Sequence, residues 1–155
     1  MKESVMQRSL LKWVKTKYPR VTFISTSTAS GGFGTRLKAA DIHSEDAHSD
    51  IIFLKKSGQY SYLCIELKAG EDKIFSKKGV LKINPDVKSH RHLIAQHKFS
   101  IKCLNDGGFA TFCCSLNEAM IVIKCYMNIE KGGEYEKGLS LSLEKYELGG
   151  IQDAR

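Results

Sequence analysis

The chain has 155 residues, of which 42% are hydrophobic and 26% are charged, a composition typical of one globular domain and not of a disordered chain. Lys and Arg outnumber Asp and Glu by 24 to 17, which gives a net charge of +7 and favours a polyanion such as nucleic acid over a membrane surface as partner. The sequence has no apolar run of about 18 residues and its first fifteen residues are too charged for a signal peptide, so we expect a soluble intracellular protein of the cytoplasm or nucleus without membrane contact.

The chain begins with an expected helix and strand. Apolar residues at helical spacing predict an amphipathic helix over residues 2–18, and Pro19 ends it. The β-branched and aromatic residues of 21–26 predict a strand. A glycine-rich loop over 27–34 and a short helix over 35–43 are expected to follow.

Two further strands are predicted at 50–55 and 60–68, on either side of a short polar segment. We expect them to form a hairpin closed by a three-residue loop over 57–59, in which Gly58 supplies a positive φ. A loop of this length places residue 50 opposite residue 66.

The next segment, 70–88, mixes glycine, proline and five lysines without clear periodicity and is expected to be a mobile basic loop. Residues 89–108 predict a helix that ends at paired glycines. An apolar strand is expected at 109–114, followed by a helix that Asn117 caps and that ends near Met127.

The remaining residues, 129–155, give the least clear pattern of secondary structure. Their alternating "LSLSL" (139–143) favours an edge strand, and 149–155 is expected to be a frayed tail. The element order predicts an α/β fold with a mixed sheet flanked by helices. We expect residues 1–128 to form the domain and 129–155 to be a C-terminal extension packed on it.

Several potential motifs favour ordinary structural roles. Five cysteines, odd in number and without CxxC spacing, predict buried reduced thiols. The five histidines show no metal-binding spacing. The "GGFG" loop lacks the GK[ST] ending of a phosphate-binding loop, so we expect no nucleotide cofactor.

The hairpin carries the candidate chemistry. Side chains alternate along a strand, so Glu66 and Lys68 share a face, and the opposed Asp50 joins them. Two adjacent carboxylates repel unless a cation or proton lies between them. We therefore predict a Mg²⁺ or Mn²⁺ site held by Asp50, Glu66 and the backbone carbonyl of Leu67, with Lys68 positioning the attacking water.

The pattern of Asp50 followed by Glu66-Leu67-Lys68 resembles the signature of PD-(D/E)XK nucleases, with Ser49 where that signature has proline. Residues 1 to 127 look like the VRR-NUC branch, which includes virus-type stand-alone nucleases. Positions matching that branch's catalytic motif are Glu3, Asp50, Glu66, Lys68 and Gln96, although Leu93 stands where a serine is common. The resemblance implies a restriction-endonuclease-like core.

Glu3 is also expected near the site from helix geometry, because positions 3, 6, 7, 10, 13 and 14 share one face; it would be a further metal ligand, directly or through water. A structural alternative remains open for each of two residues. Glu3 could only stabilise the helix through its negative charge at the helix N-terminus, and Gln96 could be an exposed surface residue. The basic residues expected to contact DNA, which could equally be a solvated surface, are Arg36, Lys38, Lys77, Lys78, Lys82, Lys88 and Arg91.

The function implied by the resemblance is that of a metal-dependent, structure-specific DNA endonuclease. Stand-alone members resemble resolvases of Holliday junctions that act as homodimers, so a branched DNA substrate and a homodimer are expected. The alternatives are a flap or restriction-type endonuclease, or a non-catalytic nucleic-acid-binding module of the same fold. A phage or other viral origin would suit such a short nuclease.

Overall fold

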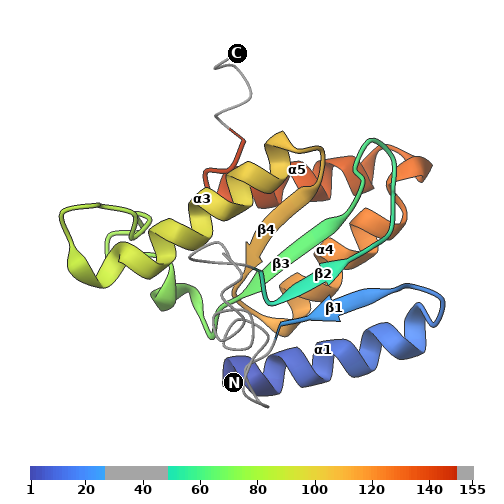
Figure 1. Ribbon diagram of the computed structural model, residues 1–155, viewed down its shortest axis with the longest axis horizontal. Coiled ribbons are helices and arrows are strands. Elements are labelled where there is room, and N and C mark those ends of the chain that lie inside the picture. The colour runs from blue at the N-terminus through green and yellow to red at the C-terminus, as the bar shows by residue number, and fades with distance from the viewer. Residues whose placement is uncertain (27–48, 150–155) are drawn as a thin grey trace, which may run out of the picture.

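The computed structural model describes residues 1–26 and 49–149. Their elements form a mixed α/β structure, with helices packed around a four-stranded sheet, as the sequence predicted (Figure 1). No helix among the described residues is long and apolar enough to cross a membrane. The main elements are α1 (Glu3–Lys17), β1 (Phe23–Ser25), β2 (Ile51–Phe53), β3 (Leu63–Leu67), α3 (Arg91–Asn105), β4 (Phe109–Cys113), α4 (Leu116–Met127) and α5 (Glu134–Lys145).

The sheet has the strand order β1-β2-β3-β4, with β4 parallel to β3 and the other neighbours antiparallel. The predicted hairpin register is confirmed, because Ile51 pairs with Ile65. One residue further along, the same register sets Asp50 opposite Glu66. β3 is thus an inner strand whose end lies beside the start of β2.

The hairpin loop differs from the prediction. Ser57 and Tyr60 exchange backbone hydrogen bonds of 2.9 and 3.0 Å, so the turn has two central residues and not three. Gly58 has φ +55°, the left-handed conformation that such a turn requires. The segment 54–56 has one residue more than 61–62 opposite it, and this bulge restores the predicted register.

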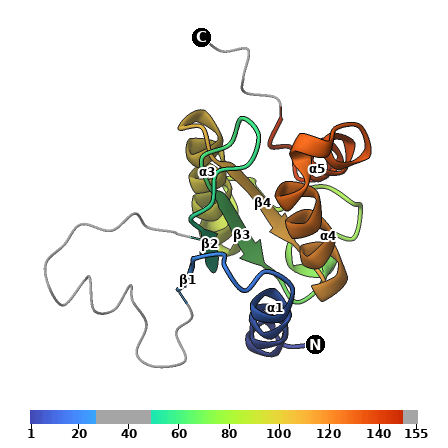
Figure 2. The ribbon, with the colours of Figure 1, turned by 90° about the vertical axis from the view of Figure 1, so that its right-hand side faces the viewer.

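The helices cover the two faces of the sheet unequally (Figures 1 and 2). Helices α1 and α4 pack on one face, where the core takes in the odd-numbered residues of β3. Helix α3 packs on the other, where Cys64 meets Cys103 and Ala110. Glu66 and Lys68 share the parity of Cys64, so they point toward α3.

The C-terminal segment belongs to the same core. The expected edge strand at 139–143 is wrong, because these residues lie in α5. Leu139, Ser142 and Tyr146 are buried, a spacing of three to four residues that suits a helix, and Leu148 follows into the core beyond the helix end. Leucine alternates with serine in "LSLSL", as it would in a strand with one buried face. Leu141 is 53% exposed, which does not fit that pattern.

The stretch 70–88 has more structure than the mobile basic loop expected. It contains the 3-10 helix η2 (Glu71–Lys73) and a bridge between Phe75 and Leu81, and the 3-10 helix η3 (Lys88–His90) begins at its last residue. Ile74 and Leu81 are buried and anchor this segment to the core. The five cysteines, in contrast, are all free and buried, as predicted.

The N-cap of α4 was assigned to the wrong residue. Ser115, not Asn117, is the cap, since its side chain accepts a hydrogen bond of 3.1 Å from the backbone N–H of Glu118. We expect Ser115→Ala to lower the free energy of unfolding by about 1 kcal/mol, measured by urea denaturation. The exposed Asn117 is the matched control, and an equal loss in Asn117→Ala would contradict this cap.

Candidate active site

Asp50 is held where β2 begins. Its Oδ2 accepts a hydrogen bond of 2.8 Å from the backbone N–H of Leu67, at the end of β3. Its backbone carbonyl accepts from the N–H of Thr26 at 2.9 Å and from Nε2 of Gln7 at 3.2 Å. The N–H and C=O of one strand residue point to the same side, so the Leu67 carbonyl is directed toward Asp50 as well.

Glu66 and Lys68 form a buried ion pair on the α3 side of the sheet. The Lys68 Nζ lies 2.8 Å from Glu66 Oε1, and only 4% of Glu66 and 9% of Lys68 are exposed. Gln96 of α3 donates from Nε2 to the same Oε1. Both of these hydrogen bonds are accepted by Oε1 of Glu66.

The first-helix glutamate reaches this region from the opposite layer. Glu3 Oε1 accepts a hydrogen bond of 3.1 Å from the backbone N–H of Ala69, just beyond β3. The prediction that Glu3 points inward is wrong, because the residue is exposed. Its carboxylate nevertheless raises the pKa of Glu66, which places it within electrostatic reach.

The protonation of Glu66 reflects this crowding. Burial is the largest cause that raises its pKa, the negative charges of Asp50 and Glu3 add to the increase, and Lys68 opposes it, so that the pKa is about 8. A carboxyl group with a pKa of about 8 holds its proton more tightly than an ordinary glutamate and is mostly protonated at neutral pH. Such a group can exchange the proton for a metal cation.

The oxygen atoms at this point suit a hard divalent cation. Carboxylates of Asp50 and Glu66 are the ligand type that Mg²⁺ and Mn²⁺ prefer. Gln96 Oε1 is buried without a hydrogen-bond partner among the described residues, which costs stability unless a cation or water satisfies it. Within the same residues, no three His, Cys, Asp or Glu side chains form a ready-made metal cage, so an ion would draw on backbone and amide oxygens or on water.

The five predicted catalytic residues lie around the end of β3, with Glu3 reaching the backbone N–H of Ala69 just beyond it, whereas the predicted DNA contacts are spread out. Arg36 and Lys38 lie outside the described residues. Lys82 is half-buried and donates from Nζ to the Asp72 carbonyl. The remaining four are exposed on the 70–88 segment and the start of α3: Lys77, Lys78, Lys88 and Arg91.

Sequence reasoning placed Gln7 on the inner face of the first helix but gave it no role. It is 7% exposed on the inner face of α1 and donates to Ser25 Oγ at 2.9 Å as well as to the Asp50 carbonyl. It therefore ties α1 to the two strands that hold Asp50. The available signal was a glutamine inside an otherwise apolar helical stripe, where a polar side chain needs a partner.

The raised pKa of Glu66 predicts a pH-dependent stability. From its ordinary value of 4.5 up to about 8, the unfolded chain loses the proton while the folded chain keeps it, so stability falls as pH rises. Glu66→Gln cannot ionise. We expect the wild-type melting temperature in EDTA to fall more than that of Glu66→Gln between about pH 5 and about pH 8.

The comparison of these two proteins cancels the titrating groups that do not interact with Glu66, so their difference curve reports Glu66 together with its charged neighbours Asp50, Lys68 and Glu3. Parallel melting curves across the whole pH range would contradict a raised pKa.

The chemistry available here combines a carboxylate pair, an ammonium group and an orienting amide at one strand end. These groups suit the binding of a divalent cation and the positioning of a water molecule beside a phosphate. No protein-family model matches the sequence, and comparisons with curated proteins and with solved structures find no significant match.

Proposed function

We propose that this chain is a Mg²⁺- or Mn²⁺-dependent endodeoxyribonuclease with a restriction-endonuclease-like core of the PD-(D/E)XK type, in the VRR-NUC branch. The observation that supports the proposal is the meeting of Asp50, Glu66 and Lys68 at one point. Asp50 and Glu66 come from adjacent antiparallel strands, and the lysine lies 2.8 Å from the glutamate. An acid pair with a buried lysine on a hairpin is an arrangement suited to phosphodiester hydrolysis.

Each residue has a distinct role in this proposal. Asp50, Glu66 and the Leu67 carbonyl would hold the ion, with Glu3 as a further ligand directly or through water. When bound, the ion supplies positive charge that stabilises the negative charge developing on the scissile phosphate. Lys68 orients the attacking water, and Gln96 fixes the Glu66 carboxylate by its hydrogen bond.

The proposed substrate is branched DNA, such as a Holliday junction, cleaved by a homodimer. The net charge of +7 favours a polyanionic substrate. The exposed lysines 77, 78 and 88, with Arg91, would neutralise phosphates beside the cleaved bond. Each such contact makes binding weaker as salt is added.

A substrate panel tests this function. Purified protein is incubated with linear duplex, flap and four-way junction DNA of matched sequence, each with Mg²⁺, Mn²⁺ or EDTA. We expect cleavage of branched substrates only with a metal. Faster cutting of the flap would favour a flap endonuclease, and sequence-specific cutting of the duplex would favour a restriction-type enzyme. Tight binding without cleavage under any condition would contradict the catalytic proposal.

A further inference from the structure

A cleft of about 840 Å³ lies next to the end of β3, within the range of roughly 300–1,000 Å³ that is usual for small-molecule sites. Its wall begins at Glu71, three residues after Lys68. Gly70 makes the intervening turn with φ +118°, where an added Cβ would lie 2.6 Å from Asp72 Oδ1. None of the candidate metal-binding side chains lines this cleft, so it is a separate feature of the same end of the sheet.

The cleft has one aromatic wall, Phe75, which is half-buried. The Phe75 ring stacks on Tyr146, with 5.9 Å between centroids and 22° between planes. Tyr146 is fully buried, and its hydroxyl donates to Glu118 at 2.7 Å. The ring of Phe75 is therefore backed by a fixed partner and presents a firm surface to the cleft.

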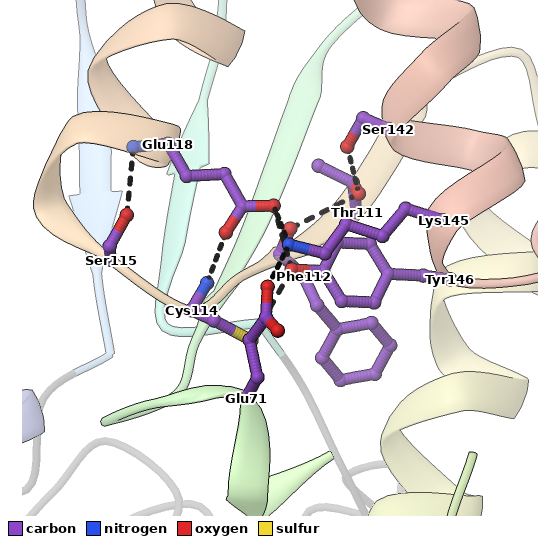
Figure 3. A network of polar contacts seen from close by, with 9 residues as sticks. All are labelled: Glu71, Thr111, Phe112, Cys114, Ser115, Glu118, Ser142, Lys145 and Tyr146. Carbon is purple, nitrogen blue, oxygen red and sulfur yellow. Dashed lines mark hydrogen bonds and ion pairs between the residues drawn. The ribbon is translucent and has the colours of Figure 1, made fainter. Parts of the chain in front are cut away.

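Three lysines line the same cleft: Lys77, Lys82 and Lys145. Lys145 lies between the carboxylates of Glu71 and Glu118, at 2.7 and 3.1 Å (Figure 3). Lys82 is held by the Asp72 carbonyl, whereas Lys77 is exposed. Lysines that line the same cleft as an aromatic ring match the alternation of phosphate and base along a single DNA strand.

We propose that this cleft binds one unpaired nucleotide of a single-stranded arm of the DNA, with its base stacked on Phe75 and its phosphate beside Lys77 and Lys82. The proposal rests on the proposed nuclease function and specifies which part of a branched substrate is recognised. In a duplex the bases stack on each other, so an aromatic wall adds affinity only for an unpaired base. The carboxylates of Glu71 and Asp72 would accept hydrogen bonds from a base N–H, which in thymine is the N3–H.

The test measures binding in EDTA, where no metal-dependent cleavage occurs. Fluorescence anisotropy with labelled oligo-dT and with a duplex of equal length compares wild type, Phe75→Leu and Phe75→Tyr. Loss of base stacking should weaken oligo-dT binding of Phe75→Leu by roughly 5- to 150-fold, which corresponds to about 1–3 kcal/mol per base. Duplex binding should change less than about twofold, and Phe75→Tyr should bind as wild type does.

Lys77→Ala provides a second readout at an exposed residue that does not contribute to the core. It should weaken oligo-dT binding and reduce the salt dependence by about one phosphate contact. Lys124→Ala, an exposed lysine on α4, is the matched control and should change neither. Competition by free dTMP separates a strand-binding site from a site for free nucleotides, because efficient displacement at low concentrations would overturn the single-strand assignment.

The outcomes also separate this proposal from the nuclease function. If Phe75→Leu and Lys77→Ala bind oligo-dT as tightly as wild type, the cleft assignment is wrong, whatever the cleavage assays show. If both variants lose oligo-dT binding but wild type cleaves no DNA with Mg²⁺ or Mn²⁺, the cleft assignment stands and the nuclease proposal fails.

Discussion

Replacing Lys68 by methionine should lower the cleavage rate by at least about 100- to 1,000-fold, the usual cost of losing one preorganised charged group that stabilises a transition state. Methionine keeps most of the buried stem of lysine but removes the ammonium group 2.8 Å from Glu66. Without that positive charge, burial and Asp50 favour the neutral form of Glu66 even more, so a cation is also bound more weakly. Single-turnover cleavage of a four-way junction at pH 8 measures the effect.

Two comparisons make this result interpretable. Lys73→Met alters an exposed lysine near the same strand end and should cut at the wild-type rate. Glu66→Gln should lose activity to a similar extent while still binding DNA in EDTA. A Lys68→Met protein that is folded and cleaves as fast as wild type would contradict the role assigned to this lysine.

Truncating Tyr146 to alanine should lower the free energy of unfolding by about 3–5 kcal/mol, the range for loss of a large buried aromatic side chain. The ring is fully buried between Phe75 and Phe112. Its backbone carbonyl lies 3.1 Å from His97 Nε2, so the same residue also joins the end of α5 to α3. Urea denaturation measures the loss.

Tyr146→Phe keeps the ring and removes only the hydroxyl that donates to Glu118. It should cost about 1.5–3 kcal/mol, the range for one hydrogen bond to a charged group. If both variants lose the expected amounts of stability, residues 129–149 are needed for the stability of the domain. A chain ending at residue 128 that unfolds at the same urea concentration as the full chain would contradict it.

The site could be predicted from sequence because it depends on short-range periodicity. Odd-numbered and even-numbered residues of β3 lie on opposite faces of the sheet. The apolar Leu63, Ile65 and Leu67 fix the face that packs against the main core, so Glu66 and Lys68 lie on the other face. The register was therefore predicted correctly although the loop was not. The bulge absorbed the difference, because burial of the strand residues outweighs the geometry of the turn.

The contacts that were missed span long stretches of chain. Lys145 pairs with Glu71 across 74 positions, and Gln7 reaches the Asp50 carbonyl across 43. No local pattern indicates such pairs, since each residue alone looks like an ordinary polar residue on a helix or turn. The strand predicted at 139–143 was wrong for a related reason. Five residues are too few to distinguish the two-residue period of a strand from the 3.6-residue period of a helix, and packing against α4 and β4 determines that this segment is helical.

The parallel pairing of β3 with β4 also affects the order of events during synthesis. The backbone N–H of Lys68 donates to the carbonyl of Cys113 at 2.9 Å, so the end of the acid-bearing strand is fixed only after a partner 45 residues later has been made. Parallel pairs of this kind form slowly, because a long loop must close first. A nascent chain in which residue 113 has not yet emerged from the ribosome therefore carries its acidic residues without the finished candidate site, which can form only after most of the chain has been translated.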